Sequence, residues 1–444
     1  MNQPYHICAA ALLLSSFFLS SVQAENAELT KQVAADEPRL LEIFKKVHAN
    51  PELSMQETET AALIAKELTA NGYVVQTGIG KTGVVGVMKN GPGPVIMFRE
   101  DMDALPLKEE SELPYASTKT GTTLDGLQSS IAHVCGHDAH VTWLIGVAKV
   151  MATQKANWSG TLILVGQPAE EAYMGAATMV KDGLYEKIPQ PSVIFAAHTN
   201  PIWPAGAVGL GQGRRMAGAV QLNVTIKGIG GHGSTPHASI DPIVMSAQAI
   251  MAYQTIVSRR IDQTEPVVLT VGAIQAGTVG NIIPDSATMR ISIRWYSTAA
   301  RDQIVAMVKQ MTDAIAVGNG VPQDRMPEYE SAHVITPVIN DDGLVTAVRP
   351  ALEQVLGKEN VYPGLPMQMG SEDFQMLGDP IAGVKILHLE VGVAKAQVVK
   401  DFMEKGTMPA YVNHHPKFQI ELPAIAAGVK ANAAVLLELL KKAP

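Results

Sequence analysis

The chain has 444 residues, of which 47% are apolar and 17% are charged, and its formal net charge is −8. This length is too great for one ordinary hydrophobic core and predicts two domains, while the composition is typical of a globular protein. The negative charge and the lack of a basic run argue against nucleic acid or an anionic membrane surface as a partner.

The first segment of the chain has the pattern of a secretory signal. Residues 7–24 are apolar or small and end on Val-x-Ala, and their length suits a signal peptide better than a bilayer span. No Lys or Arg precedes them, so an uncleaved membrane anchor is the alternative. We expect residues 1–24 to be removed and the mature protein to be secreted, to the periplasm, with no membrane attachment. Cleavage would remove Cys8 and leave Cys135 as the one cysteine.

Hydrophobic periodicity predicts helices and then strands in the part of the chain that follows. Helices are expected over 28–49, 54–69 and 141–151, and apolar or β-branched strands over 73–77, 84–88, 95–99, 161–166 and 193–197. Polar groups follow three of these strands: the acidic run 100–103, the pair Glu170-Glu171, and His198. Because ligand chemistry in open α/β sheets collects at the carboxyl ends of strands, we expect one converging site there.

The character of the chain changes near Arg214. Strands are expected over 220–227, 267–275, 287–296 and 328–334, and helices over 241–258 and 300–317. This βαββαβ order is the ferredoxin-like pattern and predicts an inserted α+β domain over 214–334. The flanking parts, 25–213 and 335–444, then form one α/β domain, whose second part carries a helix over 343–355, a strand over 384–390 and a final helix over 422–440.

A glycine-rich run at 228–233 matches G-x-G-x-x-G and follows a predicted strand. A nucleotide-binding loop would need a helix that opens at this run, but the next predicted helix begins only near Asp241. The dinucleotide interpretation is therefore rejected.

The stretch from Ala132 to His140 contains a thiol, three imidazoles and a carboxylate. Cys135 and His137 flank Gly136, and on an extended or turning backbone both side chains can face one metal ion. In isolation a Cys-x-His pair is more simply a buried thiol beside a surface histidine. The remaining candidate ligands, which favour the metal interpretation, are one of the adjacent glutamates, His198 and a histidine of the run 413–416.

Thiolate, imidazole and carboxylate together suit Zn²⁺, Mn²⁺ or Co²⁺ and not Mg²⁺ or Ca²⁺. Five protein ligands are more than one catalytic ion needs, so two ions about 3.5–4 Å apart that share a bridging ligand fit better. One carboxylate must still take a proton from water and pass it to a leaving nitrogen. One of Glu170 and Glu171 can bind metal while the other acts as the base. The alternative is a charged loop without a chemical role.

These motifs resemble the co-catalytic metallopeptidase family of aminoacylases and carboxypeptidases, in the branch of hippurate hydrolases and auxin-conjugate amidohydrolases. The matching stretches occur in the family's order over nearly the whole mature chain: 98–106, 135–140, 167–171, 230–237, 281–284 and 370–374. The resemblance implies a zinc-peptidase-like catalytic domain with helices on both faces of a mixed sheet, and an inserted ferredoxin-like domain that forms a homodimer.

The resemblance also implies a role for each residue of the site. Cys135 would bridge the two ions, Glu171 and His414 would complete one site, and His137 and His198 the other. Glu170 would be the general acid and base. Asp103 would contact a metal ligand without binding the metal itself, and would thereby orient that ligand. His414 is preferred to His415 because the family's histidine stands two places before the proline.

The inserted domain would contribute to the site of a neighbouring subunit. By the resemblance, His232 would stabilise the tetrahedral oxyanion there, and Asn281 and Arg294 would hold the substrate carboxylate. The chain departs from the family pattern at Ile291, where glycine is common, and in the longer segments 121–131 and 392–411. These regions face substrate in the family, so they bear on which substrate is accepted.

We therefore hypothesise a secreted metal-dependent amidohydrolase that acts on N-acyl amino acids or short C-terminal peptide-like amides. A water molecule that bridges two divalent ions (Mn²⁺, Zn²⁺ or Co²⁺) would be deprotonated by Glu170. The alternatives are a non-catalytic periplasmic binding or metal-carrier protein, a ureidohydrolase, and a hydrolase with Cys135 as nucleophile.

Overall fold

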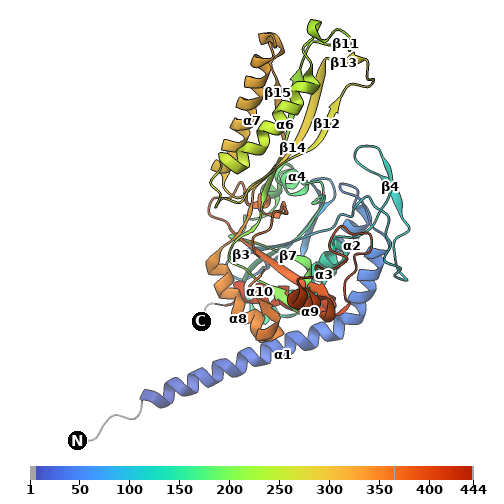
Figure 1. Ribbon diagram of the computed structural model, residues 1–444. Helices are drawn as coiled ribbons and strands as arrows, with labels where there is room; N and C mark the ends of the chain where they lie inside the picture. Colours follow the sequence, from blue (N-terminus) through green and yellow to red (C-terminus); the bar gives the residue numbers. More distant parts are fainter. Residues whose placement is uncertain (1–6, 365, 443–444) are drawn as a thin grey trace, which may run out of the picture. The chain divides into compact units, whose positions relative to one another are not determined.

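The computed structural model describes residues 7–364 and 366–442, so the first six residues of the predicted signal segment lie outside it. By its internal contacts the chain forms two compact units (Figure 1). The first unit comprises residues 1–213, 340–366 and 374–444, and the second comprises 214–339 and 367–373. The return to the first unit falls after residue 339 where the sequence suggested 334, and the contribution of 367–373 to the second unit was not foreseen.

The first unit is built on an eight-stranded mixed sheet in the order β1-β2-β6-β3-β7-β18-β8-β17. Its strands are β1 (Val74–Ile79), β2 (Gly83–Asn90), β3 (Val95–Asp101), β6 (Gly160–Gln167), β7 (Val193–Pro204), β8 (Val208–Gly209), β17 (Val361–Tyr362) and β18 (Lys385–Ala394). The central strands β6, β3, β7 and β18 run parallel to one another. β1 and β2 are antiparallel to their neighbours, whereas β8 is antiparallel to β18 and parallel to β17.

Helices cover both faces of this sheet, as expected. They are α1 (Ile7–His48), α2 (Thr58–Ala70), α3 (His137–Thr153), α4 (Gly175–Lys181), α5 (Leu184–Lys187), α8 (Asp342–Leu356), α9 (Ala396–Lys405) and α10 (Pro423–Leu439). On one face α1, α3, α8 and α10 pack together over Phe98 and Leu164. The alternate residues Met97 and Ile163 are equally buried on the other face, where α4 contacts β6.

Three predicted helices of the first unit have different starting points in the structure. The helix expected over 28–49 is the later part of α1, which begins at Ile7 and is continuous with the predicted signal segment. The helix expected over 54–69 begins at Thr58, because the residues before it form a turn that includes Met55 at a φ of 63°. The helix expected over 141–151 begins at His137, inside the Cys-Gly-His stretch. The sequence did not reveal α9, which lies in the long segment 392–411.

The second unit is a four-stranded antiparallel sheet, β12-β14-β10-β15, with α6 and α7 packed together on one face (Figure 1). Its elements are β10 (Gly218–Lys227), α6 (Pro242–Arg259), β12 (Val268–Ala276), β14 (Ser286–Trp295), α7 (Thr298–Gly318) and β15 (Glu328–Ile335). Alternate residues of β10 and β14 are buried against the helices. The chain order and the sheet order are those of the expected ferredoxin-like fold.

The remaining elements are short. They are β4 (Thr120–Thr122), β5 (Gln128–Ser130), β9 (Gly213–Met216), β11 (Gly231–His232), β13 (Ile282–Ile283) and β16 (Val338–Asn340), with 3-10 turns at Lys155–Asn157, Pro236–Ala238, Gln323–Arg325, Lys358–Asn360 and Phe374–Gly378. The glycine run at 228–233 contains β11, and α6 begins later with its first amides bonded to the Asp241 carboxylate. In the part of the chain that the structure describes, no helix combines the length and the apolar character that crossing a membrane requires.

Candidate metal centre

Three parallel strands carry the polar residues of the site to one edge of the sheet. In the ladder between β3 and β6, Asp101 pairs with Gln167, so the residues that follow these strands leave the sheet side by side. The neighbouring strand β7 contains His198. The predicted convergence of acidic and imidazole groups is therefore present. The expected end of the third strand before His198 is wrong, because β7 continues through His198 to Pro204.

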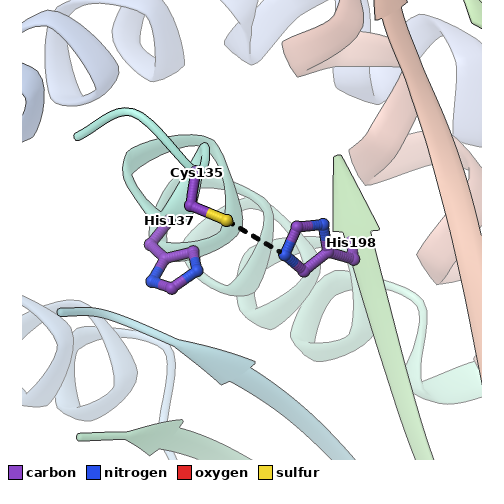
Figure 2. A group of neighbouring side chains, drawn as sticks. All are labelled: Cys135, His137 and His198. Atoms are coloured by element: carbon purple, nitrogen blue, oxygen red, sulfur yellow. Dashed lines mark hydrogen bonds between the residues drawn. The ribbon is translucent and has the colours of Figure 1, made fainter. Parts of the chain in front are cut away.

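The Cys-Gly-His turn is shaped by Gly136, which precedes α3 with a φ of 92°. Its missing side chain matters, because a Cβ at this position would lie 2.4 Å from the Thr199 hydroxyl oxygen. That hydroxyl donates to the Cys135 carbonyl at 2.6 Å, and the Asn413 side-chain amide donates to the same oxygen at 3.0 Å. The turn presents the Cys135 thiol and the His137 ring toward a common region, where His198 lies from β7 (Figure 2).

Two groups of three candidate ligands share Cys135. The first donor group is Cys135, His137 and His198, and the second is Cys135, Glu171 and His414; in each, the donor atoms lie within 4.8 Å of one another. Cys135 Sγ is 3.6 Å from His198 Nε2 and 3.3 Å from His414 Nε2. The structure thus brings together all five residues that the sequence proposed as ligands, with the sulfur in both groups.

The choice between the two C-terminal histidines also has a structural counterpart. His414 Nε2 lies 3.3 Å from Glu171 Oε1 as well as near the thiol. His415 instead accepts a hydrogen bond from the Lys417 amide and contacts the Tyr411 ring. His415 belongs to none of the ligand groups found among the described residues.

Hydrogen bonds orient the rings of the first donor group. His137 Nδ1 donates to the Asp103 carbonyl, and His198 Nδ1 donates to the Thr199 carbonyl, both at 2.8 Å. When such a ring is neutral, the proton on Nδ1 leaves the lone pair on Nε2 free for a metal ion. In His198 this Nε2 is the atom that lies 3.6 Å from Cys135 Sγ.

Buried polar side-chain atoms that make no hydrogen bond indicate whether the site fits a metal ion. Within the described residues His137 Nε2 and Glu171 Oε1 are buried, make no hydrogen bond and lie 3.9 Å apart. Glu171 Oε1 has an ion-pair contact with His414 Nε2 at 3.3 Å. Buried polar atoms of this kind are rare in native proteins unless something satisfies them. A soft thiolate, imidazoles and a carboxylate that converge on one space fit a pair of divalent transition-metal ions.

The charged groups of the site shift one another's pKa values. Burial would raise the pKa of the Cys135 thiol, but the imidazolium charges of His198 and His137 outweigh it and hold that pKa well below its usual value. Burial, together with the Cys135 thiolate, raises the pKa of Glu171 to about 7, although His414 opposes this. The group therefore favours a thiolate, which is the form of cysteine that binds metal.

The Glu170-Glu171 turn is held by Asp103. One carboxylate oxygen of Asp103 accepts the amide hydrogen of Glu170 and the other accepts that of Glu171, each at 3.1 Å. The Glu170 carboxylate is buried, and its oxygen lies within 4.8 Å of ligand atoms of His137 and Glu171. Glu170 thus stands beside both donor groups but belongs to neither of the two that contain Cys135.

A second set of buried residues supports the ligand-bearing segments, and the sequence did not identify it. His140 donates from Nδ1 to Asp101 at 2.6 Å and accepts the Thr199 amide hydrogen on Nε2. Arg99, which is completely buried, donates to the same Asp101 carboxylate at 2.8 Å. The two-residue spacing of Asp101 and Asp103, and the Asp-Ala-His run after His137, were the available signals.

The three residues expected to bind substrate all lie in the second unit. His232 is exposed on β11, next to Asn281, whose carbonyl accepts the Gly233 amide hydrogen at 2.8 Å. Nδ1 of His232 accepts the Ser234 amide hydrogen at 3.1 Å, so the neutral ring carries its proton on Nε2.

Arg294 lies on β14 and donates to the Ser371 hydroxyl at 2.6 Å. Ile291, the departure from the family's glycine, is fully buried in the core of the second unit. Since residues three apart on a strand point to opposite faces, Ile291 does not cover the face that carries Arg294.

Known proteins are similar to this chain in sequence and in fold. The model of peptidase family M20/M25/M40 matches residues 97–438. Hippurate hydrolase of Campylobacter jejuni is 38% identical over 75% of this chain and 83% of its own length, and N-acetylcysteine deacetylase of Bacillus subtilis is 32% identical over 91% and 98%. A solved dinuclear metal-binding peptidase of the M20 family from Bacillus subtilis has a TM-score of 0.73 at 27% identity, over 92% of this chain and 99% of its own. The chain belongs to peptidase family M20/M25/M40.

Proposed function

We propose that this protein is a metal-dependent amidohydrolase that cleaves N-acyl amino acids or short C-terminal peptide-like amides. The observation that carries the proposal is the pair of donor groups that share Cys135, with Glu170 beside them as a carboxylate outside both. A carrier protein has no use for such an extra carboxylate, whereas amide hydrolysis requires one.

The first ion is assigned to Cys135, His137 and His198, and the second to Cys135, Glu171 and His414, with the thiolate as the shared ligand. Zn²⁺, Mn²⁺ or Co²⁺ suits this donor set. When bound, such ions polarise a carbonyl and lower the pKa of water.

Glu170 carries the proton transfers. Its carboxylate removes one proton from the attacking water as the water oxygen bonds to the amide carbon. The same proton then passes to the leaving nitrogen as the C–N bond breaks, so the products are a carboxylic acid and a free amine. Asp103 keeps the Glu170 and Glu171 amides in place during these steps.

Substrate recognition is assigned to the second unit. Arg294 and Asn281 pair with the free carboxylate of the substrate, and the Nε2–H of His232 donates to the oxyanion that forms at the amide carbon. We assign the His232 contact to a partner subunit in a homodimer. Hippurate and N-acetylcysteine, in the names of two relatives, are both N-acyl amino acids and support this substrate class. Secretion to the periplasm after removal of residues 1–24 is part of the proposal.

The test is hydrolysis of a panel of N-acyl amino acids by metal-stripped mature protein, with Mn²⁺, Zn²⁺ or Co²⁺ added back in turn. Cleavage should appear only with metal, and Glu170→Gln should lower kcat by at least about 100-fold while it still binds two ions. Turnover near that of the unmodified protein in Glu170→Gln would refute the assigned base. Cleavage of N-carbamoyl amino acids alone would indicate a ureidohydrolase. Absence of cleavage in protein that binds two ions would indicate a metal carrier. Inactivation by alkylation with indifference to chelators would indicate a Cys135 nucleophile.

A further inference from the structure

Glu57 is a completely buried carboxylate that takes no part in either donor group. It occupies the N-cap position of α2, yet its side chain makes no capping hydrogen bond to that helix. Burial and the nearby negative charge of Asp103 raise the pKa of Glu57 to about 7, so placing the carboxyl here is unfavourable in itself. The hydrogen bonds of the Glu57 carboxylate indicate what offsets the cost of burying it.

Three donors surround the Glu57 carboxylate. Oε1 accepts the amide hydrogens of Met55, at 2.9 Å, and of Ala169, at 2.8 Å. Oε2 accepts from the Thr82 hydroxyl at 2.6 Å. Met55 and Ala169 are both in the left-handed region, with φ of 63° and 50°. The left-handed conformation is unfavourable for residues other than glycine. Two turns that are each unfavourable by themselves are therefore bonded to one oxygen atom.

Both turns lead directly to Asp103. Ser54, which precedes Met55, donates its hydroxyl to Asp103 Oδ2 at 2.6 Å. Glu170 and Glu171, which follow Ala169, donate their amide hydrogens to the two oxygens of the same carboxylate. Three donors from two separate turns therefore hold Asp103, and Glu57 connects the two turns.

We propose that Glu57 is a positioning residue, whose Oε1 locks the Met55 and Ala169 turns and thereby holds Asp103 and the Glu170-Glu171 turn in the geometry that the reaction uses. The hydrogen bonds that carry this role are formed by the protein alone. Only the catalytic consequence rests on the proposed function.

Substitutions at Glu57 separate hydrogen-bond geometry from charge. In Glu57→Gln the amide oxygen can accept both main-chain hydrogens, and its NH₂ group can donate to the Thr82 hydroxyl. Glu57→Asp keeps the charge but is one methylene shorter, and Glu57→Ala removes the acceptor. Thr82→Val is the matched control, because it deletes one buried hydrogen bond to the same carboxylate and leaves both turns attached.

The main readout is hydrogen exchange of the Glu170 and Glu171 amides in metal-free protein without substrate. We expect protection to fall by about 10-fold or more in Glu57→Ala and Glu57→Asp, and to stay within about 3-fold in Glu57→Gln and Thr82→Val. If Glu57→Ala does not fold, the comparison of Glu57→Asp with Glu57→Gln tests the proposal. In active protein kcat should follow the same order, with KM little changed.

The proposal is overturned if Glu57→Asp protects these amides as well as Glu57→Gln does, or if Thr82→Val loses as much protection as Glu57→Asp. Because exchange needs neither metal nor turnover, failure to detect amidohydrolase activity would leave this test intact. Conversely, loss of protection with unchanged kcat would keep the structural link and remove its catalytic role.

Discussion

Substitution of Gly136 by alanine should damage stability and metal binding together. Its φ of 92° would place an alanine in the left-handed region, at about 1–2 kcal/mol. The new Cβ would also lie 2.4 Å from Oγ1 and 2.6 Å from Cγ2 of Thr199, an overlap that adds about 1–3 kcal/mol. The expected loss in unfolding free energy is therefore about 2–5 kcal/mol. Since Thr199 holds the Cys135 carbonyl, its displacement should weaken both donor groups.

Gly126 supplies the matched control. It has a φ of 82° in the turn between β4 and β5, and a Cβ there would meet nothing within 4 Å. Gly126→Ala should therefore show the backbone cost alone, about 1–2 kcal/mol, with unchanged metal binding. In a double-mutant cycle, Thr199→Ala should recover part of the overlap, although the Thr199 Cβ at 3.0 Å limits the recovery.

Urea unfolding of metal-free protein measures the stability changes, and calorimetric titration with Zn²⁺ or Mn²⁺ measures binding. If Gly136→Ala destabilises no more than Gly126→Ala, the argument from the Thr199 overlap is wrong. If it destabilises as expected but binds two ions with unchanged affinity, the turn does not position the ligands.

Three further outcomes are expected. The hydrogen bonds of buried His48 with Asp138 and Glu109 outweigh its burial and raise its pKa from 6.5 to about 10. The resulting stabilisation of the folded state is on the order of 5 kcal/mol, is complete below pH 6.5 and should be lost as pH rises toward 10. Urea midpoints measured across this pH range should fall accordingly. If the midpoints of His48→Gln fell with pH in the same way, the assignment to His48 would be contradicted. Chelation should lower the Tm, and metal at 100 times its Kd should restore about 2.7 kcal/mol per ion; an unchanged Tm would argue against bound ions. Arg294→Lys should raise KM about 10-fold or more for substrates with a free carboxylate but not for their amides, and an equal effect on both would remove Arg294 from carboxylate recognition.

Much of the fold could be predicted because its signals are local. The buried strands β3, β6 and β7 each contain a continuous apolar run, and β10 and β14 alternate with period two, so their hydrophobic patterns are evident without a structure. The βαββαβ order likewise predicted the second unit. The start of α3 was misplaced because three of the residues 137–140 are polar and obscure the first helical turn, where even His137 and His140 are buried.

The candidate site was predictable in composition but not in assembly. The Cys-Gly-His run and the paired glutamates marked metal chemistry, and resemblance to a family supplied the pairing of Glu171 with His414. Nothing in the spacing of residues could place His414 at 3.3 Å from Cys135, because 279 positions separate them. The protonation pattern of His137 and the attachment of Asp103 to two turns also depend on contacts between distant segments.

The sequence alone therefore determined the kinds of elements, the two-domain order and the chemical character of the ligands, since these follow from local pattern and side-chain chemistry. Tertiary structure decided which groups share Cys135, which imidazole nitrogens are left to bind a metal, and that one buried carboxylate, Glu57, joins the turns that hold Asp103. The physical reason is that the register of parallel strands and the packing of loops at their ends are cooperative, long-range properties. They bring together residues far apart in the chain only when the whole sheet has formed.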